Sequence, residues 1–213
     1  MKKALIFDLD DTIYPTKSVA DKMFAELYAL IEKHVSEYVF KEIKEDILTS
    51  PFQKVAHRYE FSKELQQEGM KLSEEMEYNE PIKPFDDYSF IKELKVDKFL
   101  VTAGYTKLQK SKIKQLGIEK DFKEIFISDP AKTGGSKTEV FELILNKYHY
   151  QPSDVLVIGD NPEAEITAAK ELNLDTYLYD AEGKYSPALA DYYGNNYNNL
   201  KEVLEKEEAP EKL

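Results

Sequence analysis

Short runs of apolar, β-branched or aromatic residues recur along the chain, each about as long as a β-strand. Five such runs predict strands: Ala4–Phe7, Phe99–Thr102, Ile125–Ser128, Val155–Ile158 and Thr176–Tyr179. Between the last four, apolar residues at three- and four-residue steps predict helices: Thr106–Leu116, Lys137–Tyr148 and Pro162–Leu172. Strands that are apolar on both faces and alternate with helices favour a parallel sheet covered on both sides, a three-layer α/β/α fold.

The stretch between the first two predicted strands has a different pattern. It shows helical periodicity and no convincing strand, so residues 16–85 are predicted to form a helical insert within a core of residues 1–15 and 86–200. Residues 201–213, rich in Glu and Lys, are expected to end the chain as a frayed helix or a disordered tail.

Composition narrows the class of partner. The 213 residues include 41 acids against 29 Lys and Arg, and Arg58 is the sole arginine, which argues against a nucleic-acid polymer as partner. There is no cysteine, so a disulfide framework and a thiol nucleophile are excluded. No apolar run approaches the roughly 18 to 20 residues of a membrane span. These features predict a cytoplasmic protein without a membrane partner, and leave the oligomeric state open.

Acids crowd the end of the first predicted strand, in the segment FDLDDTIYP. Residues two apart in an extended segment point the same way, so Asp8 and Asp10 can reach a common point. Two carboxylates that close would repel, and a divalent cation such as Mg²⁺, which prefers oxygen ligands, would relieve the repulsion. A simple turn formed by Asp10 and Asp11 is the alternative interpretation.

Four segments follow one another along the chain: Phe7-Asp8-Leu9-Asp10-Asp11-Thr12, Val101-Thr102-Ala103-Gly104, Lys137 at the start of a helix, and the segment from Val155 to Ile166 containing Gly159-Asp160. In this order they resemble the four motifs of the haloacid dehalogenase-like (HAD) phosphohydrolase superfamily. The resemblance implies a Rossmann-like core with a helical cap inserted after the first strand. It covers about residues 1–14 and 90–195, and the insert matches only in position.

Two positions depart from the family pattern. The second acid of the fourth motif is commonly Asp, whereas this chain has Glu165, and Thr138 replaces the proline that often follows the lysine of the third motif. Lys137 is preferred as that lysine because it immediately precedes the predicted helix, and Lys132 is the alternative.

The resemblance also implies a role for each motif residue. Asp8 would attack phosphorus to form an aspartyl-phosphate, and Asp10 would act as general acid and base, with a pKa raised by the neighbouring acids. Mg²⁺ would be held by the carboxylates of Asp8 and Asp160 and the carbonyl of Asp10. The phosphate contacts would be Thr102, Ala103 through its backbone N–H, and Lys137, and the supporting residues would be Thr12, which would hydrogen bond within its own loop, Asn161 and Glu165.

The insert would exclude water and select the substrate. Tyr14, expected at the entrance, and Arg58 are candidate substrate contacts. The resulting prediction is a magnesium-dependent phosphatase acting on small phosphorylated metabolites. The alternatives are a phosphomutase on the same scaffold and a catalytically weak HAD-like protein that binds a phosphorylated ligand. A receiver domain is disfavoured because receivers are about half this length.

Overall fold

Six parallel strands form the central sheet. The computed structural model describes residues 2–132 and 136–208, and the strand order is β3-β2-β1-β4-β5-β6. The strands are β1 (Ala4–Phe7), β2 (Asp97–Ala103), β3 (Glu124–Ser128), β4 (Val155–Gly159), β5 (Asp175–Tyr179) and β6 (Tyr192–Gly194). Every neighbouring pair is parallel. The five predicted strands and the predicted parallel α/β fold are therefore confirmed.

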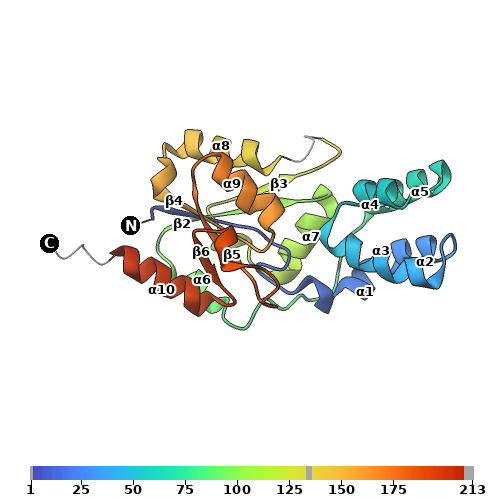
Figure 1. The fold of residues 1–213 in the computed structure, drawn as a ribbon, viewed down its shortest axis with the longest axis horizontal. Helices are drawn as coiled ribbons and strands as arrows, with labels where there is room; N and C mark the ends of the chain where they lie inside the picture. Colours follow the sequence, from blue (N-terminus) through green and yellow to red (C-terminus); the bar gives the residue numbers. More distant parts are fainter. Residues whose placement is uncertain (1, 133–135, 209–213) are drawn as a thin grey trace.

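Helices cover both faces of the sheet, as the ribbon shows (Figure 1). On one face lie α8 (Lys137–Tyr148) and α9 (Thr167–Glu171), and on the other α6 (Ser89–Glu93), α7 (Thr106–Leu116) and α10 (Tyr197–Glu208). Successive β1 residues pack on opposite faces of the sheet. Ile6 lies in a buried cluster with Phe141 of α8, whereas Leu5 lies in a different cluster with Ile113 of α7. Burial on both faces explains why these strands are continuously apolar.

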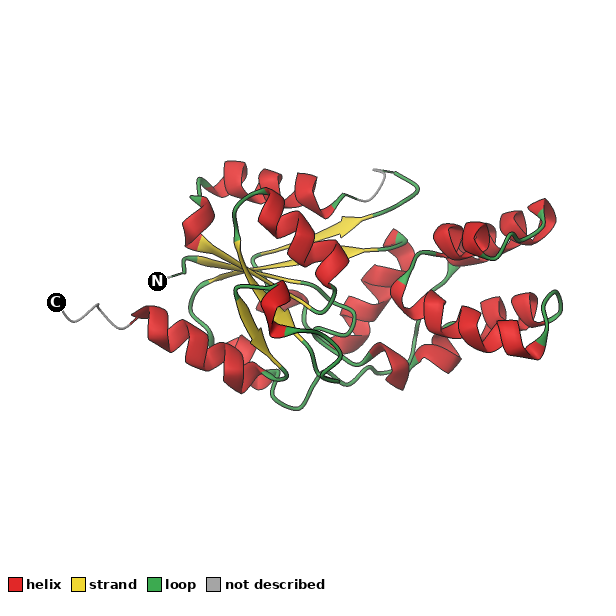
Figure 2. Cartoon of the chain, viewed as in Figure 1, coloured by secondary structure: helices red, strands yellow, loops and turns green. Residues whose placement is uncertain are grey.

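Five further helices lie between β1 and β2 in the sequence and gather at one end of the molecule (Figures 1 and 2). They are α1 (Ala20–Met23), α2 (Ala25–Glu32), α3 (Glu37–Thr49), α4 (Phe52–Arg58) and α5 (Lys63–Glu75). The side chains of Ser36 and Ser62 cap α3 and α5 by accepting hydrogen bonds from backbone N–H groups. The predicted helical insertion after the first strand is confirmed.

Shorter turns complete the chain. The 3₁₀ turns are Thr16–Ser18, Glu119–Asp121, Pro152–Asp154 and Pro187–Leu189, and one π-helical turn spans Pro162–Ile166. The last helix, α10, runs to Glu208, and residues 209–213 of the predicted tail lie outside the described residues. In the described part of the chain, no helix combines the length and apolar character needed to cross a membrane.

Two elements differ from the sequence prediction. Strand β6 was not predicted because Tyr192–Gly194 is only three residues long, too short for an apolar run to be recognised. The single helix predicted over 162–172 is instead a π-helical turn followed by α9, which ends at Glu171. The π-helical turn bears on the site, because it places Glu165.

Candidate functional site

The carboxyl ends of three adjacent strands bring the predicted acids together. Strands β2 and β4 flank β1, with Phe7 paired to Leu100 on one side and to Ile158 on the other. Asp8 follows β1 directly, and its backbone N–H donates to the carbonyl of Ile158 over 2.9 Å. Asp160, the first residue after β4, therefore lies beside Asp8, in the crevice where open parallel sheets bind ligands.

Lys137, the first residue of α8, reaches into this acidic cluster. Its Nζ lies 2.6 Å from Asp8 Oδ1 and 2.7 Å from Glu165 Oε2. The rival residue, Lys132, is exposed, and its Nζ lies 3.7 Å from Asp129 Oδ2. Of the two lysines weighed from the sequence, the structure places Lys137 at the acids.

Three carboxylates converge at the same point. One oxygen each of Asp8, Asp160 and Glu165 lie within 4.8 Å of one another. A set of carboxylate oxygens suits a hard divalent cation such as Mg²⁺. Glu165 already uses both oxygens, since Oε2 accepts from Lys137 and Oε1 accepts from the backbone N–H of Asn161 over 2.8 Å. Asp8 and Asp160 are therefore the better candidate ligands, and Glu165 the better candidate support.

A glycine makes room for Glu165. The Glu165 side chain is buried and passes directly over Gly159, where an added Cβ would lie 2.1 Å from Glu165 Cγ. Glu165 projects from the π-helical turn, which Asn161 caps by accepting from the N–H of Glu163 over 2.9 Å. Gly159 and the turn together let the longer acid reach Lys137.

Burial and charge shift the pKa values of this cluster. Burial raises the pKa of Asp8 to about 7, against the opposing charge of Lys137. Burial and then the charge of Glu165 raise the pKa of Asp160 well above its usual value. Burial acts to lower the pKa of Lys137, but the charges of Asp8 and Glu165 outweigh it and raise that pKa. The cluster therefore favours a bound cation over two bare carboxylates.

Asp10 has a different environment from the one predicted. Its Oδ1 and Oδ2 lie 2.9 and 3.0 Å from the Nζ of Lys112, and Gln109 Nε2 donates to Oδ2 over 3.1 Å. The hydroxyl of Tyr14 donates to Oδ1 over 2.5 Å. Burial acts to raise the pKa of Asp10, but Lys112, Tyr14 and Gln109 outweigh it and lower that pKa. The prediction of a raised pKa for Asp10 is wrong, because it considered the nearby acids and not these donors.

Two residues of the first loop lie differently from the expectation. Tyr14, expected at the entrance, is fully buried, and its hydroxyl contacts Asp10 from below the site. Thr12, expected to bond within its own loop, donates its hydroxyl to Asp160 Oδ1 over 3.2 Å. Its carbonyl accepts from the hydroxyl of Tyr197. Thr12 thus links the β1 loop to the β4 loop and orients Asp160.

The second motif lies beside Asp10. Thr102 is buried at the end of β2, and its Oγ1 accepts from Gln109 Nε2 over 2.5 Å. The carbonyl of Ala103 accepts from the same amide nitrogen over 3.1 Å. Because Thr102 accepts this bond, its own hydroxyl hydrogen can be donated to a ligand.

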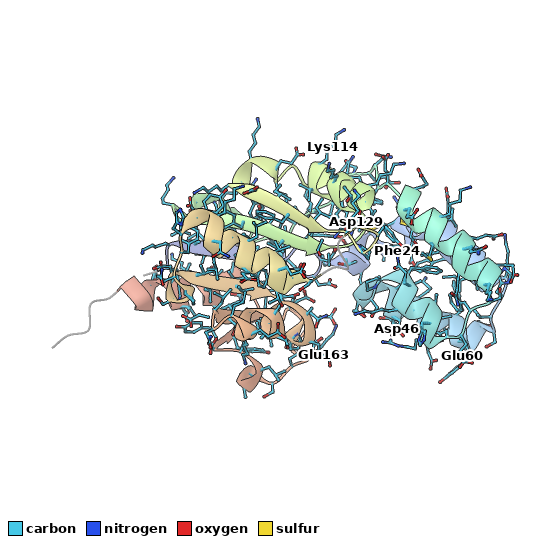
Figure 3. The ribbon with its side chains drawn as sticks, turned by 90° about the horizontal axis from the view of Figure 1, so that it is seen from above. Phe24, Asp46, Glu60, Lys114, Asp129 and Glu163 are labelled. Atoms are coloured by element: carbon cyan, nitrogen blue, oxygen red, sulfur yellow. The ribbon has the colours of Figure 1, made fainter. Side chains whose placement is uncertain are left out.

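A cavity of about 1030 Å³ opens over these residues. Its wall includes Asp8, Asp10 and Asp160 from the sheet side and residues of α2 to α5 from the other side. Figure 3 labels one lining residue from each side, Phe24 and Glu163. Arg58, on α4, also lines the cavity, is half exposed and pairs with Asp46.

Two polar residues of the site were missed from the sequence. Gln109 and Lys112 lie on α7 and are 1% and 4% exposed. A signal was present, since Gln109, Lys112, Ile113 and Leu116 follow the steps of one helix face. Polar residues on the buried face of a helix that follows a site strand are candidates for the site.

The fold and site define a class of parallel α/β proteins with acids after β1 and β4 and a helical insertion after β1. The family model for haloacid dehalogenase-like hydrolases matches residues 2–173, and the chain belongs to that family.

Curated relatives are named as phosphatases. The chain is similar to glyceraldehyde 3-phosphate phosphatase of Methanocaldococcus jannaschii, at 24% identity over 96% of each chain. It is 24% identical to pyrimidine 5'-nucleotidase PynA of Streptococcus pneumoniae, over 96% of this chain and 95% of that protein. A third match, glyceraldehyde 3-phosphate phosphatase of Pyrococcus furiosus, is 27% identical, but spans only 53% of this chain and 49%, about half, of that relative.

Solved structures support the fold. A haloacid dehalogenase-like family protein of Streptococcus pneumoniae superimposes with a TM-score of 0.74 at 16% identity, over 96% of this chain and 98% of that chain. YfnB of Bacillus subtilis, solved bound to magnesium, superimposes with a TM-score of 0.68 at 21% identity, over 95% of this chain and 98% of that chain. At these identities the likeness concerns the fold alone.

Proposed function

We propose that the protein is a magnesium-dependent phosphatase that hydrolyses small phosphomonoesters through an aspartyl-phosphate. The observation that carries the proposal is the convergence of Asp8, Asp160 and Lys137 at the ends of β1 and β4 and the start of α8, beneath one cavity. Membership of the HAD-like hydrolase family and relatives named as phosphatases support it.

In the first step, an oxygen of Asp8 attacks phosphorus. A bond forms between that oxygen and phosphorus, and the bond from phosphorus to the ester oxygen breaks. The ester oxygen keeps the electron pair and takes a proton from Asp10, so the alcohol leaves neutral. Thr102 and Lys137 donate to the phosphoryl oxygens, which carry the negative charge of the transferred group.

In the second step, water attacks the phosphorus of the aspartyl-phosphate and gives a proton to Asp10. The bond from phosphorus to the Asp8 oxygen breaks, which releases phosphate and returns Asp8 as a carboxylate. The donors around Asp10 lower its pKa, so Asp10 is ionised when this step begins and, once protonated, gives its proton up readily. Asp10 ends the cycle carrying the proton that the next substrate requires.

The acids fit a divalent cation, which we propose is Mg²⁺ held by the carboxylates of Asp8 and Asp160 and the carbonyl of Asp10. When bound, it neutralises charge on the acids and on the phosphate. Glu165 holds Lys137 in place instead of binding the ion, because both of its oxygens are engaged.

The cavity supports a small metabolite as substrate. Its volume of about 1030 Å³ is in the range of small-molecule sites, and the two kinds of curated relative are named for a triose phosphate and for pyrimidine nucleotides. We propose that residues 16–85 act as the cap, that 1–15 and 86–200 form the catalytic core, and that the protein works in the cytoplasm. Residues 201–208 belong to α10, which packs against the core through Val203 and Leu204, so the tail predicted from residue 201 is wrong for this part of the chain.

The test is phosphate release from a panel of phosphomonoesters, with Mg²⁺ and with EDTA. Wild type should turn over only with Mg²⁺, and Asp8→Asn should be inactive. Asp10→Asn should lose turnover while keeping phosphate binding. Activity retained by Asp8→Asn would refute the nucleophile assignment. Transfer of the phosphoryl group back to a sugar substrate, without net release of phosphate, would instead identify a phosphomutase.

A further inference from the structure

Helix α7 inserts a buried polar pair into the site. Gln109 and Lys112, three residues apart on this helix, both contact the carboxylate of Asp10. An ammonium as buried as that of Lys112 requires a partner with opposite charge, and both oxygens of Asp10 lie within 3.0 Å of it. Asp10 is thus held by hydrogen bonds from α7, a helix that lies outside the four family motifs.

We propose that Lys112 and Gln109 are positioning residues that orient Asp10 for proton transfer to the ester oxygen and from the attacking water. This inference rests on the proposed phosphatase function and adds two residues to its machinery. Neither residue needs to touch the substrate, since both act through neighbours that do.

The contacts explain how the orientation is held. Lys112 binds both oxygens of Asp10 from one side, and Tyr14 binds Oδ1 from the loop. With Gln109 on Oδ2, the donors from α7 and from the first loop leave the carboxylate of Asp10 little rotational freedom. Proton transfer depends steeply on such placement, because a misplacement of about 1 Å can cost 100-fold.

Gln109 couples this arrangement to the phosphate contact. Its Nε2 donates to Asp10 Oδ2 over 3.1 Å and to Thr102 Oγ1 over 2.5 Å. The two hydrogens of this nitrogen are shared among Asp10, Thr102 and the carbonyl of Ala103, and the contact with Thr102 is the shortest of the three. Because Thr102 accepts from Gln109, its hydroxyl hydrogen points elsewhere and is free for a phosphoryl oxygen.

The competing explanation is that the pair only stabilises the fold. The dependence of kcat/KM on the leaving group separates a positioning role from a purely structural role. A general acid matters greatly for an alkyl phosphate, whose alcohol leaves poorly without a proton, and little for 4-nitrophenyl phosphate. A loss caused only by destabilisation would lower kcat/KM equally for both substrates.

The experiment measures kcat/KM, which reports the steps up to departure of the leaving group, for a series of aryl and alkyl phosphates. Lys112→Met should lose about 10- to 100-fold with alkyl phosphates and less than about 3-fold with 4-nitrophenyl phosphate, within the range that general acid catalysis supplies. Lys112→Arg should recover part of the loss. The matched control is Lys114→Met on the same helix, since Lys114 is exposed and projects outward in Figure 3.

A double mutant tests whether Lys112 acts through Asp10. In an Asp10→Asn background, Lys112→Met should change the residual kcat/KM for alkyl phosphates, measured at high enzyme concentration, by less than about 2-fold, because residues that act as a unit are not additive. If Lys112→Met does not fold, as judged by circular dichroism, Gln109→Met decides by the same leaving-group series and should also raise KM through Thr102.

The outcomes are distinct. A uniform loss across the series, or additive effects with Asp10→Asn, would overturn the positioning role while leaving the phosphatase function intact. Activity that survives Asp8→Asn, measured in parallel, would instead overturn the function on which the inference rests.

Discussion

Replacing Gly159 by alanine should disturb the site through one identifiable contact. An added Cβ would lie 2.1 Å from Glu165 Cγ, whereas carbon atoms in contact are about 3.5 to 4.0 Å apart. Glu165 would have to move by more than about 1 Å, because the backbone of β4 is held by strands on both sides. That movement would strain its bonds to Lys137 and to Asn161 N–H.

The size of the effect follows from these contacts. Overpacking a buried site costs about 1 to 3 kcal/mol, and a hydrogen bond to a charged group contributes about 1.5 to 3 kcal/mol. The overpacking cost and the partial loss of the Glu165 hydrogen bonds together give a decrease of roughly 2 to 4 kcal/mol in the free energy of unfolding. For a chain of 213 residues, each kcal/mol lowers Tm by about 2 to 4 °C, so Gly159→Ala should melt roughly 5 to 15 °C below wild type.

The assay is thermal unfolding followed by circular dichroism, in wild-type and Glu165→Ala backgrounds. Removing the Glu165 side chain removes the clash, so Gly159→Ala should cost less than about 1 kcal/mol in that background. An equal loss in both backgrounds would refute the reasoning, because the cost would then not come from Glu165.

Three further predictions concern charge. Since burial raises the pKa of Asp8 from 3.8 to about 7, its protonated form stabilises the metal-free fold most below about pH 4, and this contribution is lost as the pH rises through 7. Mg²⁺ should therefore raise Tm more at pH 8 than at pH 5 in a fluorescence melt, and equal shifts would contradict the site. Lys137→Met should lower kcat/KM by roughly 100- to 1,000-fold, as expected for loss of a donor to developing charge, while Lys132→Met should match wild type; similar losses in both variants would restore Lys132 as a candidate. Arg58→Gln should lower the free energy of unfolding by less than about 1 kcal/mol, because its pair with Asp46 is half exposed; chemical denaturation measures this, and a larger loss would show a structural role.

The elements of the sheet could be predicted because each depends on its own residues. The run Val155–Ile158 is short, rich in β-branched residues and followed by Gly159, so its own residues predict a buried strand, and its carboxyl end then fixes the edge of the sheet at which Asp160 lies. Parallel strands share that side, so Asp8, Thr102 and Asp160 could be placed at one edge before any coordinates were known.

The environment of Asp10 could not be predicted in the same way. The direction of its pKa shift depends on Lys112, which is 102 positions away along the chain. Whether that ammonium reaches Asp10 is decided by how α7 packs across the sheet, which sequence periodicity does not specify. The burial of Tyr14 likewise depends on the packing of the first loop beneath the site.

The placement of α1 to α5 in one uninterrupted stretch between β1 and β2 has an evolutionary consequence. Asp8, Asp10 and Asp160 come from outside that stretch, whereas residues of α2 to α5 within it line the opposite side of the cavity. Mutation, insertion or exchange of this single gene segment can therefore alter which molecules the cavity admits while leaving Asp8, Asp10 and Asp160 in place. Proteins that descend from such a scaffold can therefore differ in what they bind while keeping the same acids.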